Sequence, residues 1–431
     1  MNLIAKLREI WRGVDHPFLI YDGRELKFAD IEAQEHINLS NIVAGDVVAI
    51  IGDFEPQSIL TLLRLIDLKA IVVPLTRETT EEHGYFFNTA LVDVVISDGA
   101  IARRTHSDQN ELVEQLRASQ HAGLVLFSTG TTGRPKAILH DLTLFLRRFE
   151  TPRPSLRTMN FLLFDHIGGI NTLLHTLFNK GVVIAPVART IESVLDSCKK
   201  YHVEVLPTTP TFLRMMLVSG AVPDKVPRCL KVITYGTERM DQPTLDELCR
   251  LLPSVDFRQT YGMSELGIVR VKSEQRTSLY MKLGGEGVET RVIDGVLHIH
   301  SQSRMLGYLN APSPFDAEGW YDTKDVVECK DNYFKVVGRV SDAVNVGGLK
   351  FMASEVERVA LDYPLVSLVS AYPRSNPITG QHVELTVQPS CEGAVDRDKL
   401  MSYLKSRLQP HMVPKRIRIQ NINVGHRVKK L

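Results

Sequence analysis

Short apolar runs alternate with helical patterns through the first three quarters of the chain, and this alternation restricts the fold more than any other feature. The runs Asp46–Gly52, Ile71–Leu75, Gly181–Pro186 and Leu230–Thr237 have the length and composition of buried strands. Between the first two, Pro56–Ala70 has helical spacing with a proline suited to a first helical turn. The pattern predicts an α/β fold with largely parallel sheets flanked by helices.

The pattern changes near residue 338. Asn332–Gly348 contains a short strand, an arginine and a glycine pair, and helices and strands follow in a new order. The remaining length suffices for a small α+β domain. We therefore predict a large N-terminal domain over residues 1–340 and a small C-terminal domain over residues 341–431, with the boundary near Ser341.

Composition excludes several classes of partner. The chain has 431 residues, with 44% hydrophobic and 23% charged residues and a formal net charge of +1. This balance gives no reason to expect a nucleic acid or an anionic membrane surface as partner. The five cysteines lie far apart without a CxxC pair, which indicates reduced thiols rather than a disulfide framework. With no apolar run of membrane-spanning length and no secretory signal, we expect a cytoplasmic protein.

The stretch LVLFSTGTTGRPKAILH, Leu124–His140, interrupts an apolar strand with hydroxyls, glycines and cations. Consecutive backbone N–H groups in such a turn form an anion-binding concavity, and Lys136 adds a mobile positive charge. We therefore interpret Ser128–Lys136 as a phosphate-binding loop. It is not a Walker A loop, because no Gly-Lys-Ser/Thr ends it. Taken alone, an ordinary turn between two elements explains the composition nearly as well.

Three later stretches contain residues suited to the rest of a nucleotide. Gln259–Gly267 (QTYGMSELG) offers a tyrosine ring for stacking on a base, and oxygen ligands for Mg²⁺ from Ser264 and Glu265. Gly319–Glu328 contains an aspartate that could accept hydrogen bonds from ribose hydroxyls. Gly338–Glu357 contains an arginine and a glycine pair. Taken alone, the first stretch is better explained as a turn and the second as a hairpin. The third can be both a ligand-binding segment and a linker before a capped helix.

In this order, the four stretches resemble the adenylate-forming superfamily of acyl-CoA synthetases, nonribosomal-peptide adenylation domains and luciferases. FSTGTTGRPK is nearly the family phosphate loop, and YGMSE matches its Tyr-Gly-x-Ser/Thr-Glu pattern. LFDHIGG is similar to the segment that lies between the family's acyl pocket and thiol tunnel. The resemblance extends from DHPFLIYDGRELKFADIE to GHRVKKL, and so covers most of the chain. It implies that a carboxylate attacks ATP to give an acyl-adenylate, and that a thiol, usually that of CoA, then displaces AMP.

The resemblance also implies a role for individual residues, with ATP, Mg²⁺ and CoA as cofactors and substrates. The implied catalytic residues are Thr131, Lys136, Glu265 and Arg427, with Glu265 holding the Mg²⁺. The implied nucleotide site comprises Ser128, Thr129, Gly130, Thr131, Thr132, Gly133, Lys136, Tyr261, Gly262, Ser264, Asp325 and Arg339. The implied acyl pocket comprises His166, Phe164, Phe212, Tyr235, Gly236 and Met263. Ser341 is the implied hinge of a rotating small domain, and Gly347 and Gly348 line the implied thiol tunnel.

The C-terminal end departs from the family pattern. The family has a lysine in a Gly-Lys-Ile/Val motif there, and matching Val428 to the aliphatic residue places Arg427 at the lysine and His426 at the glycine. Arginine is a planar, bulkier cation, so the exchange is not conservative at a tight site. Lys429 or Lys430 takes the role if the register slips. The sequence leaves open how efficient adenylation is.

The substrate and the acceptor stay open as well. The aromatic and apolar pocket residues favour an aryl or medium-chain acid, whereas Asp165 lies where amino-acid-activating relatives hold an ammonium group. Three functions remain: a ligase that makes acyl-CoA thioesters, an adenylating enzyme that loads the phosphopantetheine of a carrier protein or forms an amide, and a member with weak or lost adenylation that acts by binding.

Overall fold

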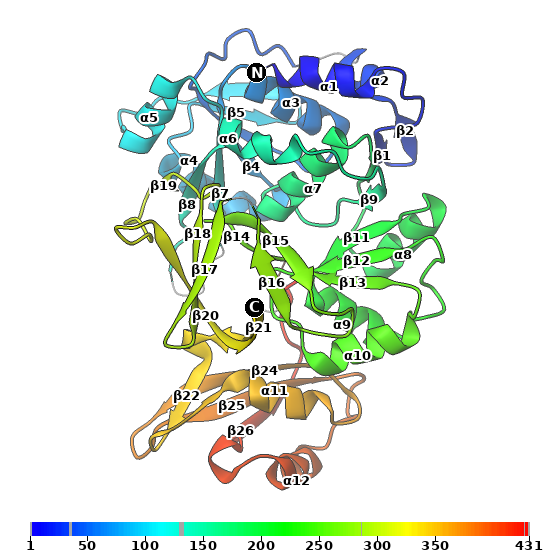
Figure 1. Ribbon diagram of the computed structural model, residues 1–431, viewed down its shortest axis with the longest axis vertical. Helices are drawn as coiled ribbons and strands as arrows, with labels where there is room; N and C mark the ends of the chain where they lie inside the picture. The colour runs from blue at the N-terminus through cyan, green and yellow to red at the C-terminus, as the bar shows by residue number, and fades with distance from the viewer. Residues whose placement is uncertain (1, 34–36, 129–132, 286, 426, 430–431) are drawn as a thin grey trace.

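The computed structural model describes residues 2–33, 37–128, 133–285, 287–425 and 427–429 (Figure 1). Within these residues the strands form four sheets, three of seven strands and one of five. The sequence expectation of an α/β architecture is confirmed, and the four predicted strands and the predicted helix named above all form. No helix in the described part of the chain is long and apolar enough to cross a membrane.

The first sheet carries the predicted phosphate loop. Its order is β19-β8-β7-β4-β3-β5-β6, and its centre is parallel whereas both edges are antiparallel. The strands are β3 (Val47–Ile51), β4 (Ile71–Leu75), β5 (Val94–Ser97), β6 (Ala100–Arg103), β7 (Gly123–Phe127), β8 (Ala137–Asp141) and β19 (Gly307–Tyr308).

The second sheet is parallel except at β1–β2, with the order β13-β12-β11-β9-β10-β1-β2. Its strands are β1 (Leu19–Tyr21), β2 (Arg24–Leu26), β9 (Arg157–Met159), β10 (Val182–Ile184), β11 (Val205–Thr208), β12 (Val232–Tyr235) and β13 (Asp256–Gln259). One apolar core joins helices α1, α3 and α7 to residues of both sheets, and a second core covers the side of this sheet that faces α8, α9 and α10.

The helices of the large domain follow or precede these strands, as the alternation in the sequence predicts. They are α1 (Leu3–Trp11), α2 (Phe28–Ala33), α3 (Pro56–Asp67), α4 (His83–Thr89), α5 (Glu111–Ser119), α6 (Leu142–Phe145), α7 (Ile167–Phe178), α8 (Ile191–Lys200), α9 (Pro210–Val218) and α10 (Gln242–Leu251), with 3₁₀ turns at Arg77–Glu82 and Leu146–Phe149.

The third sheet is antiparallel, which the alternation in the sequence does not predict, since its strands follow one another without intervening helices. Its order is β14-β15-β16-β21-β20-β18-β17. The strands are β14 (Tyr261–Met263), β15 (Gly267–Ser273), β16 (Met281–Gly284), β17 (Val288–Ile293), β18 (Val296–Ser301), β20 (Trp320–Lys330) and β21 (Tyr333–Arg339).

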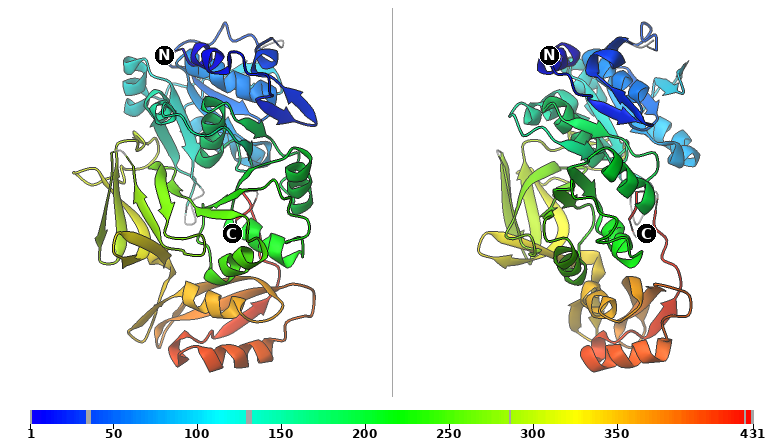
Figure 2. Two further views of the ribbon diagram at one scale, coloured as in Figure 1. Left: turned by 45° about the vertical axis from the view of Figure 1, so that its right-hand side comes forward. Right: turned by 90° about the vertical axis from the view of Figure 1, so that its right-hand side faces the viewer.

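The end of the chain forms a small unit with its own sheet and core. It comprises a 3₁₀ turn at Val340–Asp342, β22 (Ala343–Val346), β23 (Leu349–Met352), α11 (Ala353–Leu361), β24 (Val366–Asn376), β25 (Gly380–Pro389), α12 (Arg397–Arg407), a 3₁₀ turn at Pro410–Met412 and β26 (Arg416–Ile419). The buried residues of its core begin at Val344 and end at Ile417. The domain boundary near Ser341 stays a prediction. After β26 the chain leaves this unit and runs back to the large domain (Figure 2).

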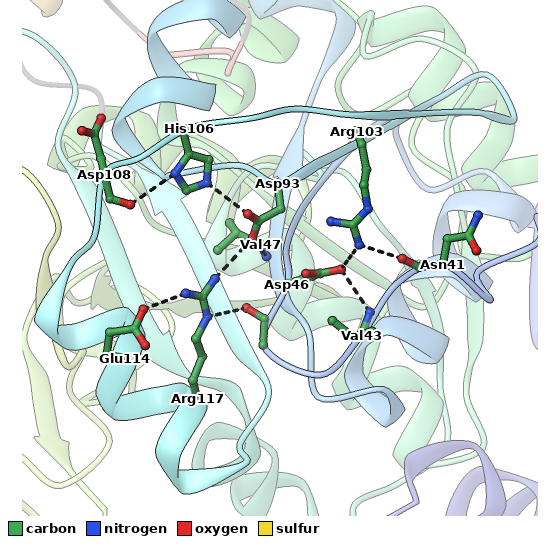
Figure 3. A network of polar contacts seen from close by, with 11 residues as sticks. Asn41, Val43, Asp46, Val47, Asp93, Arg103, His106, Asp108, Glu114 and Arg117 are labelled. Carbon is green, nitrogen blue, oxygen red and sulfur yellow. Dashed lines mark hydrogen bonds and ion pairs between the residues drawn. The ribbon is translucent and has the colours of Figure 1, made fainter.

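A polar network fixes one edge of the first sheet (Figure 3). The Asp93 carboxylate accepts a hydrogen bond from the backbone N–H of Val47 at 2.8 Å and contacts His106 at 3.0 Å and Arg117 at 3.3 Å. Arg117 also donates to the carbonyl of Gly45 at 3.0 Å. A single carboxylate therefore satisfies a buried strand N–H and ties β3 to the loop before α5.

Replacing Asp93 by alanine should lower the free energy of unfolding by about 1–3 kcal/mol, because it leaves the buried N–H of Val47 without an acceptor. Chemical unfolding of the two proteins measures this loss. Asp98→Ala is the matched control, since Asp98 is an exposed carboxylate whose side-chain partners, among the residues that the structure describes, are Arg77 and Ser97. Equal midpoints for both variants would contradict the structural role given to Asp93.

Candidate active site

The phosphate-binding loop predicted from the sequence connects two antiparallel strands. β7 and β8 pair through Phe127 and Ala137, and two hydrogen bonds close the loop above them. The backbone N–H of Ser128 donates to the carbonyl of Lys136 at 3.0 Å, and the N–H of Lys136 donates to the Ser128 hydroxyl at 3.1 Å. Gly133 lies in the open part of the loop. Four predicted loop residues lie outside the described residues: Thr129, Gly130, Thr131 and Thr132.

The YGMSE segment lies beside the foot of this loop. His140 on β8 donates from Nε2 to the carbonyl of Ser264 at 2.5 Å, which holds the segment against β8. Tyr308 on β19 donates to the Glu265 carboxylate at 2.7 Å, and the Lys136 ammonium lies 4.7 Å from the centre of the Tyr308 ring. The structure thus brings Lys136, Ser264 and Glu265 together, although they are far apart in sequence.

Glu265 is the carboxylate predicted to hold Mg²⁺ at this point. Among the described residues, no group of three or more histidine, cysteine, aspartate or glutamate side chains could hold a metal ion. Mg²⁺ is commonly bound through one or two carboxylates together with substrate phosphates, rather than by a cage of protein ligands. A single carboxylate next to a phosphate loop fits that mode of binding.

Three predicted nucleotide residues form one hydrogen-bonded chain. Tyr261 donates to Asp325 at 2.6 Å, and Arg339 contacts the second oxygen of Asp325 at 3.3 Å. Burial raises the pKa of Asp325, which its hydrogen bonds to Tyr261 and Arg339 oppose. Burial and the nearby Asp325 carboxylate raise the pKa of Tyr261 well above its ordinary value. Asp325, on β20, therefore links the tyrosine of β14 to the last residue of β21.

Strand pairing leaves no room for a side chain at Gly262. A Cβ there would lie 2.8 Å from the carbonyl oxygen of Gly267 on the paired strand β15. The family resemblance implies that this glycine belongs to the nucleotide site, and it also lines the cavity described below. The structure supplies a sufficient reason within the sheet.

His166 begins α7. Its Nδ1 accepts a hydrogen bond from the N–H of Gly168 at 2.9 Å, so a neutral ring carries its proton on Nε2. Burial, with the positive charges of Lys429 and Arg427 nearby, lowers the pKa of His166 well below its ordinary value. The ring is therefore a neutral group between the helix and the C-terminal tail.

The C-terminal tail enters this region. Arg427 pairs with Asp165 at 2.8 Å, and their side chains are 12% and 7% exposed. The Thr209 hydroxyl, at the start of α9, donates to the carbonyl of Val428 at 2.7 Å. Burial, together with the positive charge of Arg427 nearby, lowers the pKa of Lys429 to about 8. His426 and Lys430 lie outside the described residues.

These contacts change the reading of three sequence candidates. Arg427, expected to act on the substrate, is bound to Asp165. Asp165, considered as a site for a substrate ammonium group, is occupied by Arg427. The ammonium group of Lys429 makes no hydrogen bond or ion pair within the described residues, and is the tail cation that remains available there. Neither partner of the ion pair gives a local sequence signal of the other, since 262 positions separate them.

A cavity of about 330 Å³ lies between α7 and the second sheet. His166, Thr208 and Tyr261 line its end near the predicted nucleotide residues, at the carboxyl ends of the parallel strands. Asn179 and Val205 line the other end. His166 also borders a small second cavity lined by Arg427, Val428 and Lys429. His166 therefore lies between the cavity and the cations of the C-terminal tail.

The cavity is lined differently from the predicted acyl pocket. His166 lines it, but the predicted aromatic residues do not. Side chains alternate along a strand, so Val232 and Thr234 of β12 face the cavity while Tyr235 is buried in the opposite core. Phe212 belongs to that same core.

The remaining predicted pocket residues also lie elsewhere. Phe164 packs in the core between the two sheets, with its ring 5.4 Å from that of Phe54. Met263 packs against the core of the third sheet. A Cβ on Gly236 would lie 2.1 Å from the Thr260 hydroxyl, so this glycine is required by its neighbour rather than by a ligand. The cavity is lined by threonine, valine and polar residues of α7, and not by the aromatic residues that the sequence analysis assigned to the acyl pocket.

The predicted hinge and thiol-tunnel residues lie in the small unit. Ser341 lies in the 3₁₀ turn after β21, where its hydroxyl donates to Asp342 at 3.0 Å. Gly347 and Gly348 form the turn between β22 and β23 with φ of +61° and +91°, a conformation that favours glycine. Neither glycine lines the cavity described above, so their role in a thiol tunnel stays a prediction.

Comparison with known proteins gives consistent matches. The AMP-binding enzyme family matches residues 12–309. The 4-coumarate–CoA ligase-like 6 of Arabidopsis thaliana is 23% identical over 333 residues, which are 69% of this chain and 58% of that relative. The chain spans about three-fifths of the length of the curated relatives it matches, since it covers 58% to 62% of three of them.

Solved structures share the whole fold. ATP-bound MatB of Rhodopseudomonas palustris superposes with a TM-score of 0.80 at 18% identity, over 99% of this chain and 96% of that one. The o-succinylbenzoate CoA synthetase MenE of Bacillus subtilis, solved with its acyl-adenylate intermediate, gives a TM-score of 0.77 at 17% identity, again over 99% and 96%. At this identity the likeness shows a shared fold.

Proposed function

Because this chain belongs to the AMP-binding enzyme family, we propose that it activates a carboxylic acid with ATP and transfers the acyl group to a thiol. In the first half-reaction a carboxylate oxygen bonds to the α-phosphorus of ATP, and the bond to the bridging oxygen breaks and releases pyrophosphate. In the second, a thiol of CoA or of a carrier protein's phosphopantetheine attacks the acyl carbon. AMP leaves, and the thiol proton goes to solvent. We place the acid in the cavity along α7.

One observation carries this proposal: His166 lines the cavity on one side and contacts the site of the tail cations on the other. An acid in the cavity would thus place its carboxylate near His166 and Lys429. The hydrogen-bonded residues Tyr261, Asp325 and Arg339 lie at the same end of the cavity, because Tyr261 is part of the cavity wall. The groups needed to hold a nucleoside, an acid and the charge between them converge there.

We assign these residues the following roles. The loop N–H groups and Lys136 hold the β- and γ-phosphates, and Glu265 holds the Mg²⁺, which when bound neutralises phosphate charge. Tyr261, Asp325 and Arg339 hold the adenosine. Lys429 lies over the carboxylate and the α-phosphate, where negative charge develops as the two anions approach. The neutral His166 donates a hydrogen bond from Nε2 without adding a charge.

Pyrophosphate release tests the proposal. Purified protein is mixed with ATP, Mg²⁺ and a panel of aryl, medium-chain and amino acids, without a thiol. We expect pyrophosphate release that depends on the acid, and consumption of CoA when CoA is then added. Release with an acid but no use of CoA would favour a carrier-protein or amine acceptor. No release with any acid, from protein that binds ATP, would contradict the assignment as an adenylating enzyme.

Adenylation should also lose rate above pH 8. The pKa of Lys429 is lowered to about 8, so its ammonium loses its proton as the pH rises through that value, and the positive charge over the α-phosphate disappears. The initial rate of pyrophosphate release from pH 6.5 to 9.5 measures this loss. Lys429→Arg keeps its charge throughout, and should not show the decline above pH 8. A decline of equal size in that variant would assign the titration to another group.

A further inference from the structure

The wall of the cavity formed by α7 has two free polar side chains. The side chains of Asn171 and His175 line the cavity, and neither side chain makes a hydrogen bond within the described residues. They lie on one face of the helix, about 7.5 Å and 13.5 Å further along its axis than His166, for five and nine residues at 1.5 Å each. They are therefore set back from the end where we place the reacting carboxylate.

The other polar residues of this face are occupied within the helix. The hydroxyl of Thr172 donates to the carbonyl of Gly168 at 2.8 Å, and that of Thr176 donates to the carbonyl of Thr172 at 2.8 Å. The amide of Asn179 donates to the carbonyl of His175 at 2.7 Å. An occupied hydroxyl has little to gain from a ligand, whereas the amide of Asn171 and the imidazole of His175 can each form new hydrogen bonds.

The charge around the cavity favours an acceptor on the ligand. The described lining residues include Arg258 but no aspartate or glutamate. Burial and the positive charge of Arg153 lower the pKa of His175, so its ring stays neutral and can donate one hydrogen bond. Nothing in this wall would balance a ligand ammonium group. A carbonyl or carboxylate oxygen, in contrast, would find two N–H donors, one from Asn171 and one from His175.

The opposite wall restricts the shape of the ligand. It is built from alternate residues of the parallel strands, among them Val205, Pro207, Val232 and Thr234. These are compact side chains without a charge, and they lie across from the helix along its length. A narrow, largely apolar body fits between the two walls.

We infer that the cavity selects acids that carry a hydrogen-bond acceptor at the end remote from the activated carboxylate, and that Asn171 and His175 are the residues that select them. The inference rests on the proposed function, since it takes the cavity as the acyl site. It names the substrate class as narrow acids with a distal carbonyl, amide or carboxylate oxygen. It also excludes acids with a distal ammonium group.

A matched series of straight-chain acids tests the inference. The acids have equal length and end in a methyl, a primary amide, a carboxylate or an ammonium group, and each is assayed by pyrophosphate release without a thiol. We expect the amide- and carboxylate-ended acids to have KM values about tenfold lower than the methyl-ended acid, as one added hydrogen bond predicts. The ammonium-ended acid should be the poorest substrate.

Variants assign the preference to the two residues. Asn171→Leu and His175→Leu should each reverse the preference toward the methyl-ended acid, while His175→Gln, which keeps a donor, should retain it. Asn171→Asp places a carboxylate in the wall with little change of shape, and should shift the preference toward the ammonium-ended acid. Asn332→Leu, at an exposed position in the β20–β21 turn, is the control and should leave the order of the four acids unchanged.

Calorimetric titration of the same acids, in the presence of ATP, distinguishes a failure of the proposed function from a failure of the inference about the cavity. If no acid releases pyrophosphate but the titration shows the expected order of affinities, the proposed function fails and the inference stands. If pyrophosphate is released but the methyl-ended acid is preferred, or the Leu variants keep the wild-type order, the inference is overturned and the function stands. If no acid of the series binds or reacts, both are overturned.

Discussion

Lys429→Met should lower the rate of acid-dependent pyrophosphate release by about 100- to 1000-fold, the range found when one preorganised group that stabilises transition-state charge is removed. The ammonium of Lys429 is the tail cation without a partner among the described residues, and its pKa near 8 shows how far burial withdraws it from water. A charge in such a site is stabilised by incoming phosphate more strongly than an exposed one would be. Methionine keeps most of the volume of lysine and removes only the charge.

The measurement is single-turnover pyrophosphate release with saturating ATP and acid. Arg427→Lys is the matched control. A lysine there keeps a positive charge opposite Asp165 but loses the fork of the guanidinium. We expect this variant to retain far more activity than Lys429→Met. If instead Lys429→Met is active while Arg427→Lys gains rate over the wild type, the assignment is reversed and Arg427 occupies the catalytic position, as the sequence alone suggests.

Asp165→Asn should release the C-terminal tail and reduce adenylation to the level of Lys429→Met. Asp165 and Arg427 are almost fully buried, and removing one partner of a buried ion pair costs about 3–5 kcal/mol when the other charge must stay. Unlike a core residue, Arg427 can avoid this cost, because the tail can detach and carry its guanidinium back into water. The Thr209–Val428 hydrogen bond alone, worth roughly 1 kcal/mol, would not hold it.

Limited proteolysis after Gln420 and pyrophosphate release together measure this effect. We expect faster cleavage of the tail and slower adenylation in Asp165→Asn, and no change of cleavage in Lys429→Met, whose tail keeps its ion pair. The double variant Asp165→Arg with Arg427→Asp restores opposite charges, and should recover part of both properties. A tail equally resistant to protease in Asp165→Asn and wild type would show that the ion pair does not hold it.

The sequence predicted the parts of the molecule in which the local pattern carries the information. Alternating strands and helices predicted the parallel sheets, and Pro56 begins its helix where expected. The motif residues Lys136, Glu265 and Asp325 could be found because each occurs in a recognisable stretch. The antiparallel third sheet was not predicted, since its strands have irregular lengths and mixed burial and lack helices between them.

The cavity lining could not be predicted because it depends on which side of a strand faces α7. In β12 a shift of one residue exchanges Thr234 for Tyr235, and the segment alone does not say which of its two faces is covered by the larger core. The more accessible positions of β12 and β13 carry valine, threonine, aspartate, arginine and glutamine, while the buried ones carry isoleucine, tyrosine and phenylalanine. This difference between the two faces was the sequence signal that could have shown which face is covered by the core. The pairing of Asp165 with Arg427 had none, because it depends on the path of the tail.

The return of the tail has a consequence for the timing of the two half-reactions. Besides the covalent connection at Ser341, the small unit contacts the large one through the hydrogen bonds of Arg214 to the carbonyls of Val366 and Ser367, the Arg239–Glu357 ion pair, and the tail contacts of Arg427 and Val428. A rotation of the small unit about Ser341 would require all of these contacts to break. If the small unit rotates about Ser341 for thioester formation, as the family resemblance implies, the tail contacts have to break first, and the withdrawing tail would take Lys429 away from the phosphate site proposed above. The two half-reactions would then occur in a fixed order, because a thiol could enter only after the Lys429 ammonium had left the site.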